Sequence, residues 1–143
     1  MAKAPKTRCG GTWTEGKRRS FIRSALRRAF TRYPSCYIAK NNARRPYKGT
    51  NKSQKWEYQC SECKEWFLGK LTQLDHTTPA GSISSDDDIG PFVTRLFCEP
   101  DGLTVMCKPC HKTKTATERE QRNEAKNTVK NTKRPKPKRR VSK

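Results

Sequence analysis

The first regular pattern along the chain is an apolar stripe of helical period within residues 14–33. Arginines occupy the side opposite this stripe, so the predicted helix can pack one face on a core and present the other to phosphate groups. Pro34 ends it, because a proline ring clashes with the preceding turn of a helix. An ordinary surface helix with solvated arginines is the alternative. The stripe consists of Phe21, Ile22, Ala25, Leu26, Ala29, Phe30 and Tyr33.

Shorter elements are predicted downstream. Residues 71–75 and 103–106 show the pattern of two short strands. The loop at 79–91 contains three consecutive aspartates, which suit the N-terminus of a short helix over 92–97. A last helix, poor in apolar residues, is predicted from about 111 to 126. The order of these elements predicts a small α+β fold.

The other segments are polar. Residues 1–12 are predicted to be flexible, 40–55 to be a linker or basic loop, and 130–143 to be disordered until they meet a polyanion. We therefore divide the chain into three parts: a basic N-terminal arm at 1–55, a central module at 56–128 and a disordered basic tail at 129–143.

Charge separates these parts further. The chain carries a net charge of +20, but residues 56–110 hold 4 basic and 9 acidic residues. Residues 1–55 hold 16 basic residues and one acid, and residues 130–143 hold 8 basic residues and no acid. Basic arms bind polyanions by releasing condensed counterions, and nucleic acid is the commonest such partner. A membrane surface is disfavoured because the arms lack the amphipathic apolar face that insertion needs.

Seven cysteines are present, and four of them form two Cys-x-x-Cys pairs, Cys60/Cys63 and Cys107/Cys110. The N-terminus has no apolar stretch, so we expect no signal peptide and a cytoplasmic location, where paired cysteines bind metals more often than they form disulfides. Two such pairs complete a tetrahedral thiolate shell, which predicts a structural Zn²⁺. A redox-active pair is the alternative. The other three, Cys9, Cys36 and Cys98, are interpreted as buried or free thiols.

Both histidines of the chain fall within or beside this frame: Asp75-His76 lies between the pairs and His111 follows Cys110. An imidazole titrates near neutral pH and can act as a general base, whereas carboxylate and imidazole groups can hold a divalent cation. The structural alternative is a pair of incidental surface or core histidines.

The segments "LDHTTPAGS" (74–82) and "GLTVMCKPCHKTKT" (102–115) resemble the HNH endonuclease family, and most nearly its small phage-encoded members. The resemblance covers residues 56–116 and implies a ββα-metal module stapled by the zinc of the four cysteines. It implies a DNA endonuclease with His76 as general base, and with Asp75 and His111 holding a catalytic Mg²⁺ or Mn²⁺. Host-cell cytoplasm would be the location of a phage-encoded enzyme.

One position departs from the family pattern. The family's middle asparagine falls at Gly102 here, which leaves open what orients His76; Asp101 or a backbone carbonyl could substitute.

DNA, double-stranded or branched, is the expected partner of a monomer or homodimer. A different class of function remains open, namely a non-catalytic zinc-stabilised module that binds nucleic acid or a polymerase as a regulator. The residues predicted to contact nucleic acid are Arg19, Arg23, Arg27, Arg28, Lys114, Lys138, Arg139 and Arg140. A solvated helix position is the alternative for Lys114.

Overall fold

A computed structural model describes residues 3–132, and the chain divides between Cys107 and Lys108 into two compact units. The first unit holds three helices and three small antiparallel sheets, and the second holds one long helix. This confirms the predicted α+β class within the described residues. Among these residues, no helix is both long enough and apolar enough to cross a membrane.

The predicted N-terminal helix is present as α1 (Glu15–Phe30). Thr14 caps it, because its hydroxyl accepts a hydrogen bond from the Lys17 amide at 3.1 Å. Helix α1 ends at Phe30, before the predicted end at residue 33, so Pro34 does not itself break it. Pro34 is instead the first residue of α2 (Pro34–Asn42), a position where the missing N–H of proline costs nothing. Helix α2 was not predicted, because its sequence has no clear apolar stripe.

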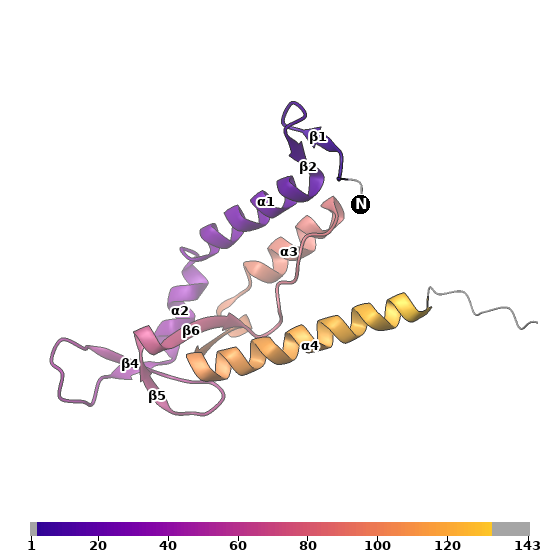
Figure 1. Cartoon of the computed structure of the whole chain (residues 1–143). Coiled ribbons are helices and arrows are strands. Elements are labelled where there is room, and N and C mark those ends of the chain that lie inside the picture. The colour runs from indigo at the N-terminus through magenta and orange to yellow at the C-terminus, as the bar shows by residue number, and fades with distance from the viewer. Residues whose placement is uncertain (1–2, 133–143) are drawn as a thin grey trace, which may run out of the picture. The chain divides into compact units, whose positions relative to one another are not determined.

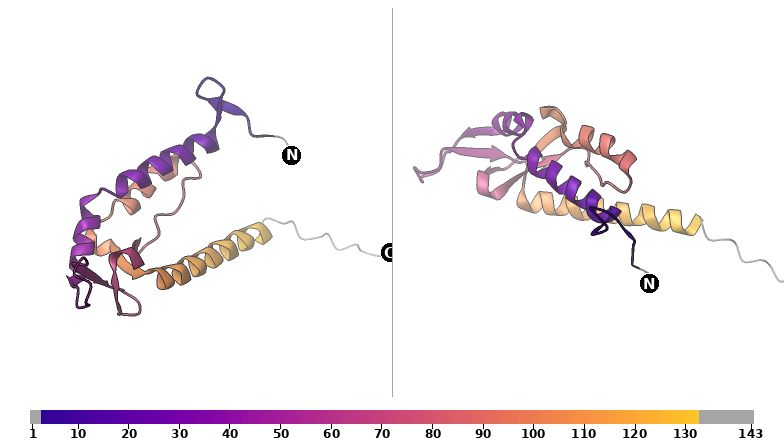
Figure 2. Two further views of the ribbon diagram at one scale, coloured as in Figure 1. Left: turned by 60° about the vertical axis from the view of Figure 1, so that its left-hand side comes forward. Right: turned by 90° about the horizontal axis from the view of Figure 1, so that it is seen from above.

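Helix α1 lies beside α3 (Ile89–Leu96), as the views in Figure 1 and Figure 2 agree. The contact is apolar, because Ile22, Leu26 and Phe30 pack against a buried cluster that contains Phe92 and Leu96. These three residues confirm the predicted stripe. Phe21 does not follow it, since 55% of the residue is exposed.

Two segments predicted to lack regular structure contain strands. β1 (Lys6–Arg8) pairs with β2 (Trp13–Thr14), so residues 1–12 are not simply flexible where the structure describes them. Residues 40–55 contain the end of α2 and β3 (Arg44–Pro46), which joins β4 (Trp56–Gln59) and β5 (Trp66–Leu68) in the order β3-β4-β5. Pairing with later segments, which composition does not reveal, satisfies the polar backbone there.

The bounds of the two strands that carry the candidate site agree with the predicted bounds to within about one residue. β6 (Thr72–His76) pairs antiparallel with β7 (Leu103–Cys107), so Thr72 faces Cys107 at one end and His76 faces Leu103 at the other. Three short 3₁₀ turns, at Gly69–Leu71, Asp86–Asp88 and Pro100–Gly102, flank these strands and α3.

The aspartate run precedes α3 as predicted, and it forms the 3₁₀ turn Asp86–Asp88. Asp88 and Ser85 form a reciprocal capping box, in which the Asp88 carboxylate accepts the amides of Ser84 and Ser85 at 2.8 Å each. The hydrogen bond from the Ser85 amide, followed by that from Ser84, lowers the pKa of Asp88 below its usual value.

The second unit is α4 (Lys108–Thr132), which begins three residues earlier and ends later than the predicted 111–126. It therefore extends into the segment predicted to be disordered, and the rest of that segment, 133–143, lies outside the described residues. Lys114 pairs with Glu118 one turn further along this helix, at 3.6 Å. Such pairs stabilise a helix that has little apolar surface to bury.

Candidate metal centre and catalytic strand

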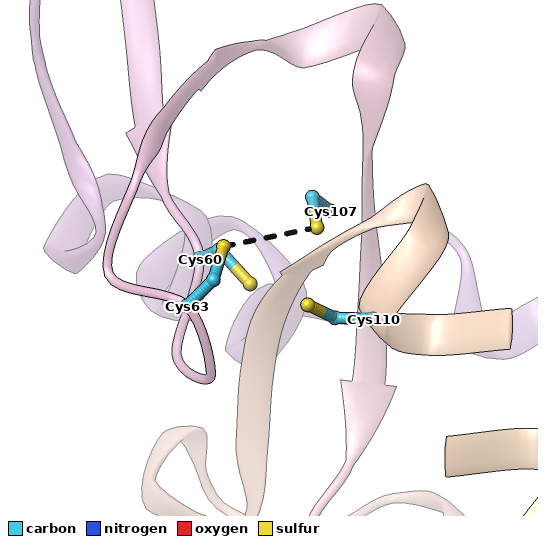
Figure 3. A group of neighbouring side chains, drawn as sticks. All are labelled: Cys60, Cys63, Cys107 and Cys110. Carbon is cyan, nitrogen blue, oxygen red and sulfur yellow. Dashed lines mark hydrogen bonds between the residues drawn. The ribbon is translucent and has the colours of Figure 1, made fainter. Parts of the chain in front are cut away.

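The four cysteines of the two pairs gather into one group, as Figure 3 shows. All four Sγ atoms lie within 4.8 Å of one another, and Cys63 Sγ is 4.0 Å from Cys107 Sγ. With Zn–S bonds of about 2.3 Å, sulfur atoms at the corners of a tetrahedron lie about 3.8 Å apart. The group could therefore hold a metal ion with little rearrangement, and its donor atoms are compatible with structural zinc.

The backbone places the first pair of thiols. β4 leads into Cys60, whose amide donates to the Glu65 carbonyl at 2.9 Å, while its carbonyl accepts from the Lys64 amide at 3.0 Å. Lys64 adopts a positive φ of 62°, which closes the tight turn. Next to Cys60, the Ser61 amide donates to the Val105 carbonyl at 2.8 Å. The first cysteine turn is thereby fastened to β7, the strand that ends on Cys107.

The electrostatics of the cluster favour a thiolate at Cys60. Burial raises the pKa of this thiol, but the backbone amides of Cys107, Cys63 and Glu62 together outweigh it and lower the pKa to about 6. Thiolates are the form that binds Zn²⁺. A buried Cys60 that is deprotonated near neutral pH is therefore ready to bind a cation. The spacing of the cysteines in the sequence does not reveal this lowered pKa.

His76 lies at the end of β6 with only 9% of the residue exposed. Its Nε2 is 2.9 Å from the carbonyl oxygen of Leu96, and its ring is 4.7 Å from the ring of Phe30. A carbonyl oxygen can only accept, so in the neutral imidazole this bond places the proton on Nε2 and the lone pair on Nδ1. The structure thus fixes both the orientation and the tautomer of the predicted general base.

Asp75 is also held by a hydrogen bond, since its Oδ1 accepts the backbone amide of His76 at 2.9 Å. The two residues therefore share one short stretch at the end of β6, but the ring of His76 turns toward α3. The sequence did not identify the two groups that hold this ring, Leu96 and Phe30, because a carbonyl acceptor leaves no sequence signal.

Gly102 is placed where a larger residue would collide. A Cβ at this position would lie 2.8 Å from Cys98 Sγ, a distance that real contacts essentially never show. The Gly102 carbonyl accepts the amide of Thr77 at 2.9 Å, directly after His76. Backbone groups of Gly102 and Leu96 therefore hold the residues around the imidazole, and a backbone carbonyl is one of the two substitutes that the sequence left open.

The other predicted site residues are distributed as follows. His111 lies in the first turn of α4, next to Cys110; its position relative to Asp75 and His76 stays a prediction. Arg23 is half-buried and Arg28 exposed on α1, while Arg27 lies 5.6 Å from the centre of the Phe92 ring. Arg19 approaches Asp86 at 3.9 Å. Lys138, Arg139 and Arg140 lie outside the described residues.

The three remaining cysteines are free thiols, as predicted. Cys9 is exposed, Cys36 is buried and Cys98 is half-buried. Burial raises the pKa of both Cys36 and Cys98, which keeps these two in the neutral thiol form.

No protein-family model, curated protein or solved structure matches this chain.

Proposed function

We propose that the chain is a metal-dependent DNA endonuclease of the HNH type. The main support is the hydrogen bond from His76 Nε2 to the Leu96 carbonyl, because it leaves the lone pair of a neutral imidazole on Nδ1. The element order β6, β7, α4 matches the strand, strand and helix of a ββα-metal module, and the cysteine group offers its zinc site.

In the proposed reaction, Nδ1 of His76 takes a proton from a water molecule, which attacks the phosphorus atom in line with the leaving oxygen. The P–O3′ bond breaks and the leaving oxygen takes a proton from solvent water, which gives a 5′-phosphate and a 3′-hydroxyl end. Asp75 and His111 would hold a divalent cation, Mg²⁺ or Mn²⁺, which supplies positive charge to the phosphate and the leaving oxygen. One such site cuts one strand, so a monomer nicks DNA and a homodimer can break both strands.

The zinc has a separate role in this proposal. Four thiolates fill its tetrahedral shell and leave no position for water or substrate, so the ion is structural. It would fix the end of β7 that lies at Cys107, whereas the chemistry takes place at the other end of the β6–β7 ladder.

The basic residues would supply affinity for DNA. Arg23, Arg27 and Arg28 lie on α1, and the segment 130–143 adds 8 basic residues. Contacts of this kind go to phosphates and carry little sequence information.

The function is tested by incubating supercoiled plasmid with the protein and Mg²⁺ or Mn²⁺. We expect wild type to convert the plasmid to the relaxed form, and His76→Ala to lose at least about 100-fold in rate, as expected when a general base is removed. Zinc content and the circular dichroism spectrum of the variant must match wild type, so that loss of folding is excluded.

Two results would contradict the proposal in different ways. Relaxation that persists in His76→Ala would remove the imidazole from its assigned role. A wild type that binds DNA but cuts no supercoiled, linear or branched form would instead favour the non-catalytic zinc-stabilised regulator.

A further inference from the structure

The sheet β3-β4-β5 has one face that the proposed catalytic site does not use. Residues directly opposite each other in paired strands project from the same face. The register places Arg44 opposite Tyr58 and Tyr58 opposite Phe67, and places Pro46 opposite Trp56. Side chains two residues apart on a strand also share a face. We call these five residues, Arg44, Pro46, Trp56, Tyr58 and Phe67, the aromatic face.

The opposite face of the same sheet has its charges paired internally. Arg45 forms an ion pair with Glu57, and its guanidinium lies 3.8 Å from the centre of the Trp66 ring. Glu57 is only 8% exposed. The one carboxylate within these three strands is thus neutralised on the opposite face, and the aromatic face carries Arg44 with no acid among its members.

The aromatic face is open and cationic at its outer edge. Trp56 remains 39% exposed although the Arg44 guanidinium lies 4.1 Å from its ring centre. The loop at 47–55, which joins β3 to β4, contributes three exposed lysines and no acid: Lys48, Lys52 and Lys55. The exposed indole offers a flat ring for stacking, and the Arg44 guanidinium beside it offers positive charge to a polyanion that also carries flat rings.

A cavity of about 220 Å³ adjoins the aromatic face at Tyr58. Its lining residues include Lys40, Thr72 and Gln73, whose side chains carry an ammonium, a hydroxyl and an amide group. Gly69 approaches the Tyr58 ring so closely that a Cβ there would lie 3.2 Å from it, so a side chain at 69 would crowd the ring. The residues around the cavity are Lys40, Tyr58, Gly69, Thr72, Gln73 and Leu74.

From this arrangement we infer that the aromatic face and the Tyr58 cavity bind unpaired nucleotides of a DNA strand. Bases would stack on Trp56, a base edge would meet the polar groups of the cavity, and the phosphates would lie along Arg44 and the lysines of the loop. Bases inside a duplex are stacked on each other and cannot make these contacts, whereas single strands bind through aromatic stacking and a cationic track.

The binding of unpaired nucleotides does not depend on the proposed catalysis. The inference rests on the proposed function only where it places the bound nucleotide next to the reacting residues. Gln73 and Leu74 line the cavity and directly precede Asp75 and His76 on β6. A nucleotide held in the cavity would therefore lie beside the strand that carries the chemistry. The substrate class that follows is DNA with an unpaired segment near the cut, such as a branch, a flap or a bubble.

Binding is measured by fluorescence anisotropy with a labelled dT₁₂ single strand and with a 12-base-pair duplex, in buffer without added divalent cation, so that no cleavage is needed. Trp56→Ala should weaken binding of the single strand by about 5- to 150-fold, since stacking of one base is worth about 1–3 kcal/mol. Trp56→Phe should retain most of the affinity. The duplex should bind with nearly unchanged affinity in both variants.

Trp13→Ala is the matched control, because Trp13 is also a partly exposed tryptophan with a cation, Lys17, 4.7 Å from its ring centre. It should leave the binding of the single strand within about twofold. Equal losses in Trp56→Ala and Trp13→Ala, or equal losses on single strand and duplex, would overturn the inference. If wild type binds the single strand as predicted but cuts no DNA, the inference stands and the proposed catalysis fails.

Discussion

Backbone groups hold the candidate general base His76 and the residue that follows it. The Nε2 of His76 donates to the Leu96 carbonyl, and the next amide, that of Thr77, donates to the Gly102 carbonyl at 2.9 Å. The glycine at 102 thus contributes through its carbonyl oxygen and through the absence of a side chain. Cys98 fills the space where a Cβ would lie.

Gly102→Ala should therefore destabilise the protein. The new methyl group would meet Cys98 Sγ at 2.8 Å, and overpacking of this kind costs about 1–3 kcal/mol. The cost is measured as the change in the free energy of unfolding in urea. It should be smaller when Cys98→Ala is also present, because that change removes the sulfur atom; the 3.2 Å contact with Cys98 Cβ would remain. Additive costs in the double variant would show that the collision is not with Cys98.

At the scale of elements, local patterns predicted the helices and strands that depend mainly on residues close to them in the sequence. The stripe of α1, the alternation in β6 and the aspartates before α3 are all local signals, and each element is present. The strands β1 and β3 were missed because short polar strands are stabilised by distant partners, which composition does not reveal. For the candidate site, the sequence singled out the side chains of Asp75 and His76, whose roles stay predictions, but not the carbonyl of Leu96 that orients the imidazole.

The capping box of the 3₁₀ turn that precedes α3 should give a defined pH dependence. The pKa of Asp88 is lower in the folded protein than in the unfolded chain, so its contribution to stability is complete above the unfolded value and is lost as pH falls through the folded pKa. Asp88→Asn should therefore be less stable than wild type at pH 7, and this difference should shrink below about pH 3.9. The comparison is made on urea midpoints at several pH values.

The adjacent variant Asp87→Asn provides the control, because Asp87 is exposed and its side chain takes no part in the capping box. Asp87→Asn removes no capping hydrogen bond, so at pH 7 it should lose less stability than Asp88→Asn. A stability difference for Asp88→Asn that does not change with pH would show that the Asp88 carboxylate takes no part in the loss of stability in acid.

At the scale of the whole molecule, most of the basic charge and the cysteine cluster lie in different parts of the sequence. The chain carries 33 basic and 13 acidic residues, yet 9 of the acids fall within 56–110, the segment that contains the β6–β7 pair and all the cysteines of the cluster. Basic charge, and with it the expected affinity for a polyanion, is thus concentrated outside this segment. The integrity of the segment itself is expected to depend on the thiolates.

One zinc ion per chain should be found by elemental analysis, and Cys60→Ser should abolish it. Removal of one ligand from a closed thiolate shell removes most of the metal affinity, and the folding free energy that the metal supplies is lost with it. The circular dichroism of Cys60→Ser should therefore show unfolding. Cys9→Ser, which changes an exposed cysteine outside the cluster, should keep both zinc and fold. Full zinc content in Cys60→Ser would contradict the four-cysteine site.

Deletion of residues 130–143 should flatten the dependence of DNA binding on salt. The segment holds 8 basic residues, and each phosphate contact contributes about 0.9 to the slope of log affinity against log salt concentration. The slope should fall by up to about 7. Titrations of duplex DNA at several salt concentrations measure it, and an unchanged slope would exclude this segment from the interface.

The β6–β7 ladder has a consequence for the order of events during synthesis. Its two strands are separated by residues 77–102, and the second cysteine pair is not complete until Cys110 has been made. Closing this loop costs entropy, which the full ladder and a bound metal would help to offset. We therefore expect a nascent chain to expose its basic arm outside the ribosome while the strand end at His76 is still unformed. The proposed ability to cut would arise only after Cys110 has been made, when the basic arm can already bind a polyanion.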